Sequence, residues 1–306
     1  MAVTVRRYPV ELAGFEVPVV EVTGSEGPRL TVIAGVHGCE YASMAGVRQW
    51  VNSLADRDLR GTVVAVPVLN LAAFWARSPF VIPEDDKNLN RFFPGDPSGT
   101  ITERFAHAVF TQLITGSDAL IDAHCGDQPE ALEPFTLFEA GPAEERALGL
   151  ATAYGLGYII RQEPGPGRAV SGTSTSAAAQ AGIAAITAEA GGCGIVEPDK
   201  VAMHVRGLNR VLAYLGMADT DEPPTVAAPV RLTQFLWQRS EQAGWWEPAV
   251  SVGDSVADGQ LLGTVTSLDG AEVRQRVRAP TAGVPMFITS SPAVVADGLL
   301  LGLGAA

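Results

Sequence analysis

The sequence is poor in lysine and in long apolar runs, and each shortage excludes a class of protein. Only two lysines occur among 306 residues, and acidic residues outnumber basic ones 34 to 21. Because nucleic-acid phosphates are bound by clustered lysine and arginine, this balance argues against a nucleic-acid partner. No apolar run approaches the roughly 20 residues that span a bilayer, and the N-terminus lacks the apolar stretch of a signal peptide. We therefore expect a cytoplasmic protein with no membrane partner.

Cysteine is also scarce. Cys39, Cys125 and Cys193 are odd in number and form no C-x-x-C pair, so neither a disulfide framework nor a thiolate zinc knuckle is indicated. A chain of this length with 47% hydrophobic residues can bury a core without covalent links. The composition predicts a globular protein with reduced thiols.

Residues 1–222 alternate short β-branched runs with longer alanine-rich periodic segments, which is the pattern of an α/β domain whose sheet is flanked by helices. Residues 70–99 are rich in Pro, Asp and Asn and predict a long, functional loop. Thr100 and Glu103 have the spacing of a capping box and predict a helix start. The expected strands are 17–22, 29–36, 62–69, 118–124, 134–140, 156–160 and 182–190, and the expected helices are 39–55, 100–115, 142–154, 173–181 and 197–215.

Residues 223–306 have a different sequence pattern, in which short strand-like runs are interrupted by Gly and Asp. This pattern predicts a small all-β domain. The runs VSVGDSVADGQLLG and APTAGV resemble the barrel-sandwich hybrid of lipoyl and biotinyl carriers. Such carriers attach their cofactor to a lysine, and this region contains none. Cofactor carriage is therefore excluded, and a structural or gating role is expected.

The segment GVHGCE, residues 35–40, places His37 and Glu40 three positions apart where a strand gives way to a helix. One helical turn can aim both side chains at one point. His124 ends the apolar run ALIDAH and is expected at the same carboxyl edge of the sheet, where ligands of open α/β sheets gather. Two histidines and a glutamate are the three protein ligands of a catalytic zinc site. The alternative for His37 is a residue at the start of a helix that is hydrogen-bonded to the backbone. Asp122, two residues before His124, is expected to accept a hydrogen bond that orients the His124 ring, and its alternative is an ordinary buried acid.

A zinc hydrolase also needs a group that moves protons. Glu189 is the candidate, because it ends a third apolar run and Gly191 and Gly192 follow it closely. In NLNRFFPGD, Asn90 and Arg91 offer an amide and a planar fork suited to a substrate carboxylate. The alternative for Glu189 is a solvated acid at a strand end, and the alternative for Arg91 is a solvated arginine.

The ordered segments GVHGCE, NLNRFFPG, IDAHCGD and TAEAGG resemble the succinylglutamate desuccinylase and aspartoacylase family, zinc-dependent deacylases related in fold to zinc carboxypeptidases. The resemblance runs from about residue 30 to the C-terminus. It implies a zinc-carboxypeptidase-like mixed sheet flanked by helices. It also implies one Zn²⁺ per chain on His37, Glu40 and His124, substrate binding by Asn90 and Arg91, and acid/base catalysis by Glu189.

Three residues depart from the aspartoacylase pattern, one at the place of an arginine thought to stabilise the oxyanion (Pro83) and two at places that contact the acidic substrate. Aspartoacylases have arginines where this chain has Pro83 and Ala179, and a C-terminal tyrosine, whereas no tyrosine follows Tyr214 here. N-acetylaspartate and succinylglutamate are thus disfavoured as substrates. The pattern is more similar to less specialised members, including those that deacetylate N-acetyl-diaminobutyrate.

The resulting hypothesis is zinc-dependent hydrolysis of the amide in a small N-acylated amino acid carrying a carboxylate, by a protein that could form a homo-oligomer. The alternatives are a zinc carboxypeptidase or esterase with the same site, or a lapsed site that serves as a binding module. A cysteine hydrolase is disfavoured because His107 and His204 fall within expected helices, where they would lie at the surface or in packing. Cys39 replaces an aspartate common in the family, and we predict that it packs away from the metal.

Overall fold

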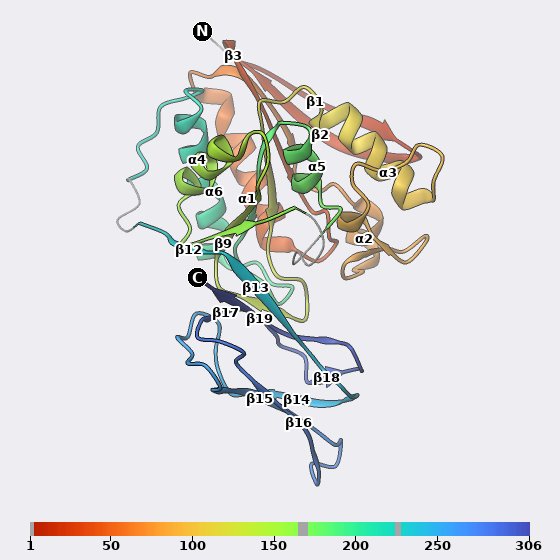
Figure 1. Cartoon of the computed structure of the whole chain (residues 1–306). Helices are drawn as coiled ribbons and strands as arrows, with labels where there is room; N and C mark the ends of the chain where they lie inside the picture. The colour runs from red at the N-terminus through yellow and green to blue at the C-terminus, as the bar shows by residue number, and fades with distance from the viewer. Residues whose placement is uncertain (1–2, 165–170, 224–227) are drawn as a thin grey trace.

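The computed structural model describes residues 3–164, 171–223 and 228–306, and its centre is a mixed nine-stranded sheet (Figure 1). This confirms the α/β class with a mixed sheet flanked by helices. In spatial order the strands are β1 (Thr4–Leu12), β2 (Phe15–Thr23), β4 (Arg60–Val66), β3 (Ser25–Ala34), β7 (Ala119–His124), β11 (Ala184–Glu189), β9 (Phe135–Glu139), β10 (Tyr158–Gln162) and β12 (Val230–Leu232).

The middle of this sheet is parallel, and most residues of its strands are buried. Strand β3 pairs in parallel with β4 and β7, and β7 pairs in parallel with β11. Every residue of β7 is buried, as is the second half of β3, because helices cover both faces. The carboxyl ends of β3, β7 and β11 therefore meet at one edge of the sheet.

Five longer helices form the two outer layers (Figure 1). On one face lie α1 (Tyr41–Asn52), α4 (Glu144–Tyr154) and α6 (Pro198–Tyr214), packed around Trp50. On the other face lie α3 (Ile101–Val109) and α5 (Ser174–Gln180), packed around Phe105. The predicted capping box of Thr100 and Glu103 is confirmed at the start of α3. Short helical turns η1 (Ser53–Asp56) and η3 (Phe110–Ile114) extend α1 and α3.

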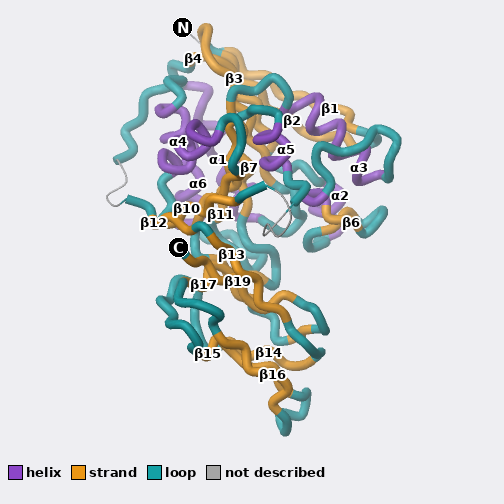
Figure 2. The backbone as a smooth tube through the Cα atoms, in the orientation of Figure 1, coloured by secondary structure: helices purple, strands orange, loops and turns teal. Residues whose placement is uncertain are grey.

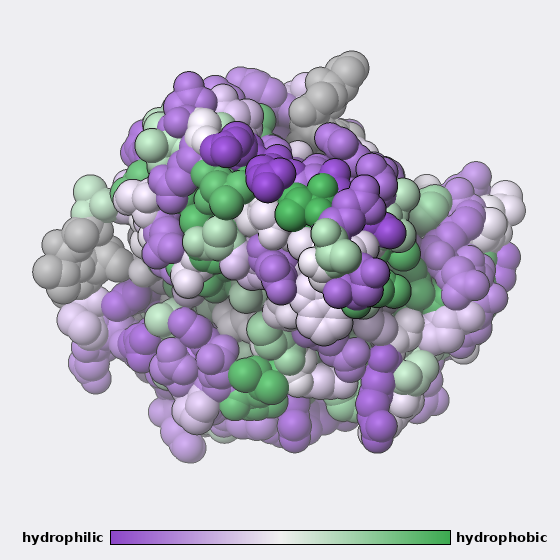
Figure 3. Space-filling view, turned by 90° about the horizontal axis from the view of Figure 1, so that it is seen from below, coloured by the Kyte–Doolittle hydropathy of each residue, from purple (hydrophilic) through white to green (hydrophobic). Residues whose placement is uncertain are grey.

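Two four-stranded sheets form the C-terminal part, which we call the β domain (Figure 2). Their orders are β13-β19-β17-β8 and β16-β15-β14-β18, and Leu262, Leu301 and Leu303 lie in the core between them. Seen from this end, hydrophobic residues on the outer surface are interspersed with hydrophilic ones (Figure 3). The strands are β8 (Glu130–Leu132), β13 (Gln234–Arg239), β14 (Gly244–Pro248), β15 (Leu261–Thr266), β16 (Val273–Arg278), β17 (Val284–Thr289), β18 (Ala293–Val294) and β19 (Leu299–Ala305).

The α/β part of the chain contributes one strand to a sheet of the β domain, and the C-terminal part contributes one strand to the large sheet. Strand β8 precedes much of the large sheet in the chain yet pairs with β17, and β12 follows α6 yet pairs with β10 at the edge of the large sheet. This exchange fixes the β domain against β9, β10 and β12, and Phe135 at the amino end of β9 contacts Phe235 on β13. The division of the chain at residue 222 stays a prediction.

Two segments differ from the expectation. Strand β1 was not predicted, because as an edge strand it pairs only with β2 and leaves most of its side chains exposed or half-buried. The expected loop 70–99 contains a short helix α2 (Leu71–Ala76), a hairpin of β5 (Val81–Ile82) and β6 (Lys87–Asn88), and a turn η2 (Leu89–Arg91). Within the described ranges, no helix is both long and apolar enough to cross a membrane.

Candidate metal centre

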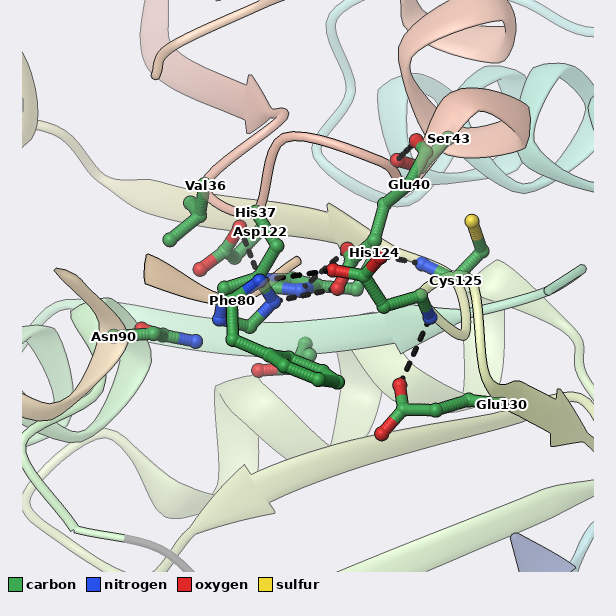
Figure 4. A network of polar contacts seen from close by, with 12 residues as sticks. Val36, His37, Glu40, Ser43, Phe80, Asn90, Asp122, His124, Cys125 and Glu130 are labelled. Atoms are coloured by element: carbon green, nitrogen blue, oxygen red, sulfur yellow. Dashed lines mark hydrogen bonds and ion pairs between the residues drawn. The ribbon is translucent and has the colours of Figure 1, made fainter. Parts of the chain in front are cut away.

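His37, Glu40 and His124 converge at the carboxyl edge of β3 and β7 (Figure 4). His37 lies in the turn after β3, Glu40 directly precedes α1, and His124 is the last residue of β7. The Glu40 carboxylate sits between the two rings, with Oε1 2.5 Å from His37 Nδ1 and Oε2 2.8 Å from His124 Nδ1. One ligand atom from each residue lies within 4.8 Å of the others, so the group could hold a metal ion.

The second nitrogen of each imidazole faces a fixed oxygen. His37 Nε2 lies 3.1 Å from Asn88 Oδ1. His124 Nε2 lies 2.9 Å from Asp122 Oδ1, although the two atoms are not aligned as a hydrogen bond. Asp122 in turn accepts a hydrogen bond from the Ser174 hydroxyl at the start of α5. Such outer oxygens are typical partners of metal-binding histidines, because they set the ring orientation and leave Nδ1 for the ion.

The charges of the site suit a cation. Although burial opposes it, His124 and His37 lower the pKa of Glu40 to about 2. Burial alone would lower the pKa of His124, but Asp122 and Glu40 raise it well above its usual value. The buried carboxylates of Asp122 and Glu40 thus stabilise a positive charge at His124. Two imidazole nitrogens and one carboxylate oxygen are a donor set that a divalent transition metal accepts.

Glu189 ends β11 directly beside His124, its register partner on β7. Its Oε2 atom is buried and has no hydrogen-bond partner in the described part of the chain. Burial, aided by the charges of Glu40 and Asp122 and opposed by the charge of His124, raises the pKa of Glu189 to about 8. An unpaired buried carboxyl next to a metal site can take up and release a proton.

Asn90 and Arg91 lie on η2 and line the same cavity as the histidines, which has a volume of about 440 Å³. Asn90 Oδ1 accepts a hydrogen bond of 3.0 Å from Ser174 N–H, and its amide nitrogen points toward the histidines (Figure 4). Arg91 Nη1 donates to the Asn90 carbonyl at 2.7 Å. The structure therefore brings all six predicted site residues into one cavity.

The cysteines near the site have no features of a nucleophile. Cys39 is fully buried and Cys125 is 2% exposed, and the Cys125 sulfur points away from the histidines (Figure 4). Burial raises the pKa of Cys39 and, more strongly, that of Cys125, which disfavours the reactive thiolate. Cys39 is absent from the metal-capable group found among the described residues, consistent with a packing role.

His204 on α6 is a buried packing residue that holds the chain just after Glu189. Its Nε2 lies 3.1 Å from the Ala190 carbonyl, and its Nδ1 lies 2.8 Å from the Tyr154 hydroxyl. Because a carbonyl can only accept, Nε2 carries the proton and Tyr154 donates to Nδ1. No sequence pattern pairs Tyr154 with His204, since they are 50 residues apart.

Acidification is expected to destabilise the protein through His204. Burial lowers the pKa of His204 to about 4, whereas an unfolded histidine titrates near 6.5. The unfolded chain binds the extra proton between these values, so the free energy of unfolding falls as pH falls from 6.5 to 4, by up to about 3 kcal/mol. Urea unfolding at about pH 7.5 and 4.5 should show a smaller loss in His204→Gln than in the wild type. Equal losses in the two proteins would contradict the expectation.

Comparisons with known proteins agree with this geometry. Residues 26–215 match the succinylglutamate desuccinylase/aspartoacylase catalytic domain. The chain is 31% identical over 257 residues to N-alpha-acetyl-L-2,4-diaminobutyric acid deacetylase of Halomonas elongata, covering 81% of this chain and 73% of that protein. The product-bound structure of the Ectoine utilization protein EutE (DoeB) from Ruegeria pomeroyi superposes with a TM-score of 0.87 at 24% identity, covering 99% of this chain and 95% of that one.

A second solved structure has the same fold. It is the succinylglutamate desuccinylase/aspartoacylase from Rhodobacter sphaeroides, which is 22% identical, with a TM-score of 0.85 and coverage of 99% of this chain and 94% of that one. The family domain and the Halomonas relative together cover the whole candidate metal centre. The chain belongs to the succinylglutamate desuccinylase/aspartoacylase family.

Proposed function

We propose that this protein is a zinc-dependent hydrolase that cleaves the amide bond of a small N-acylated amino acid. The observation that carries the proposal is the buried group of His37, Glu40 and His124, with the Glu189 carboxyl beside it in one cavity. The Halomonas relative supports amide cleavage, because it is a deacetylase of an N-acetylated amino acid.

The roles follow from the positions of the side chains. A zinc ion held by His37, Glu40 and His124 would act as a Lewis acid toward the amide carbonyl and lower the pKa of the attacking water. Glu189 takes the proton of that water on Oε2 and returns it to the departing amine. Asp122 keeps the His124 ring in place, and Asn90 and Arg91 bind the substrate carboxylate.

The cavity supports a substrate with one carboxylate. Pro83 and Ala179 occupy the places where aspartoacylases have arginines, and neither lines the cavity as far as the structure describes it. Among the described lining residues, only Arg91 and Arg239 are permanently cationic. Arg239 Nη1 already donates to the Asp297 carbonyl at 2.6 Å and lies 3.7 Å from the Asp297 carboxylate, so Arg91 is the cation left for a substrate carboxylate among the described lining residues. A dicarboxylic substrate such as N-acetylaspartate is therefore a poor fit, whereas N-acetyl-diaminobutyrate is compatible.

The proposal is tested by metal analysis and a substrate panel. Protein purified without added metal is expected to carry about one zinc ion per chain, and to release free amine from N-acetyl amino acids. Glycyl peptides and acetate esters of matched size serve as the comparison for a carboxypeptidase or an esterase. Amine release confined to the peptides would favour the carboxypeptidase. A protein that holds no zinc and hydrolyses none of these compounds would be a binding module, and the proposal would be wrong.

A further inference from the structure

The β domain supplies one wall of the cavity, and that wall is aromatic. The cavity is lined by Phe235 and Trp237 on β13, by Phe287 on β17 and by Phe135 on β9. We call these four residues the aromatic wall. Their rings form one contact series, with centroids 6.1 Å apart for Phe135 and Phe235, 4.7 Å for Phe235 and Trp237, and 5.5 Å for Trp237 and Phe287.

The alternation of β13 explains why these rings face the cavity. Successive side chains of a strand point to opposite faces, so Phe235 and Trp237 share one face while Leu236 between them packs into the core of the β domain. On the neighbouring strand β19, Gly302 pairs with both Trp237 and Phe287. A Cβ atom at Gly302 would lie 2.4 Å from Phe235 Cε1 and 3.2 Å from Trp237 Cζ3, so the glycine leaves room for the rings to lie against the sheet.

Further apolar side chains line the cavity, namely Leu132, Leu137 and Leu299. The charged side chains that the strands of the β domain add to the lining are Glu130 on β8 and Arg239 on β13. The total volume of about 440 Å³ is in the range of roughly 300–1,000 Å³ that holds drug-sized ligands. An acetyl group and an amino-acid backbone need only the polar end, where the histidines, Asn90 and Arg91 lie.

We propose that the aromatic wall is a binding subsite for a ring-sized apolar group, so that the preferred substrates are N-acyl amino acids that carry an aromatic or branched aliphatic group. This inference rests on the proposed deacylase function and names its substrate class. The group could belong to the acyl chain or to the amino-acid side chain, since either places apolar surface against the same rings. Burial of such a group is worth about 10- to 100-fold in kcat/KM.

The wild-type protein alone provides the first test. kcat/KM is measured for N-acetylglycine, N-acetylphenylalanine and N-benzoylglycine by release of the free amine. A gain of about tenfold or more over N-acetylglycine is expected for at least one aromatic compound, and the compound that gains tells whether the side chain or the acyl group fills the subsite. Equal values for all three would overturn the subsite and leave the deacylase function standing, whereas hydrolysis of none would overturn both.

A pair of tryptophan variants provides the second test. Trp237→Ala is expected to lower the ratio of kcat/KM for the better aromatic compound to that for N-acetylglycine by about tenfold. Trp245→Ala is the matched control, because Trp245 lies on β14 of the same domain, is 45% exposed and does not line the cavity. It should keep the ratio. If Trp237→Ala does not fold, Trp237→Leu serves in its place. An unchanged ratio in the folded variant would contradict the proposal.

Discussion

Glu189→Gln is expected to lower kcat by about 10²- to 10⁴-fold, the usual contribution of a general acid/base, while zinc content stays at the wild-type value. Glutamine has nearly the shape of glutamate and can donate to a neighbour, but it cannot accept and return a proton. Glu189 Oε2 has no hydrogen-bond partner in the described residues, so the change breaks no described bond at that atom and should have little effect on stability. Three measurements on the same preparation check these expectations. Turnover of an N-acetyl amino acid gives kcat, metal analysis gives the zinc content, and thermal unfolding gives the stability.

Glu130 is the matched control for this variant. It faces the same cavity, and burial raises its pKa to about 8, as for Glu189. Its Oε2, however, accepts a hydrogen bond of 2.8 Å from Asp127 N–H, and it lies on β8 rather than beside His124. Glu130→Gln should therefore lose much less turnover than Glu189→Gln. If the losses are reversed, Glu130 is the proton carrier and our assignment is wrong.

The pH profile gives a separate test of Glu189. Activity requires the ionised carboxylate, so kcat/KM should rise with pH through the pKa of Glu189 and then level off. Burial raises that pKa to about 8, and a nearby divalent cation would lower it because it stabilises the carboxylate. The rising limb should therefore lie below pH 8 in the zinc enzyme. A profile that only falls with rising pH over this range would contradict a carboxylate base.

The convergence of the site residues could be predicted from the sequence, because parallel strands end at a common edge of the sheet. His124 and Glu189 each close an apolar run, and those runs became β7 and β11, adjacent and in register. The turn after β3 then delivers His37 and Glu40 by chain connectivity alone. These relations depend on strand periodicity and sheet geometry, which short segments of sequence encode.

Pairings between distant segments could not be predicted in this way. Strand β8 is three residues long and joins a sheet whose other members lie more than 100 residues further along the chain. Its side chains carry no periodic signal that would name β17 as a partner. The aromatic wall could not be predicted for the same reason. Phe135 and Phe235 are in contact only because β8 and β12 join the two parts of the molecule. The contact of Asn88 with His37 also depends on how the β6 hairpin folds back.

His37→Ala is expected to lower zinc affinity by more than about 100-fold and to abolish turnover at ordinary zinc concentrations. Loss of an outer partner of a metal ligand alone costs about 10- to 100-fold, so loss of a ligand should cost more. The variant also leaves the buried Glu40 carboxylate with the His124 ring and the Cys125 N–H as its partners. Treatment of the wild type with a chelator should give the same inactive state without the mutation, and added zinc should restore only the wild type.

The matched control is His107→Ala, because His107 lies on α3 and belongs to no metal-capable group among the described residues. Zinc bound per chain, turnover and thermal midpoint are measured for both variants with and without added zinc. A ligand that binds only the folded state raises the thermal midpoint, so zinc should stabilise the wild type and His107→Ala but not His37→Ala. If His37→Ala binds and is stabilised by zinc like the wild type, the ion lies elsewhere. Because the Glu40 carboxylate contacts both rings directly, the chelator-treated wild type should still fold, and this separates loss of the ion from loss of the structure.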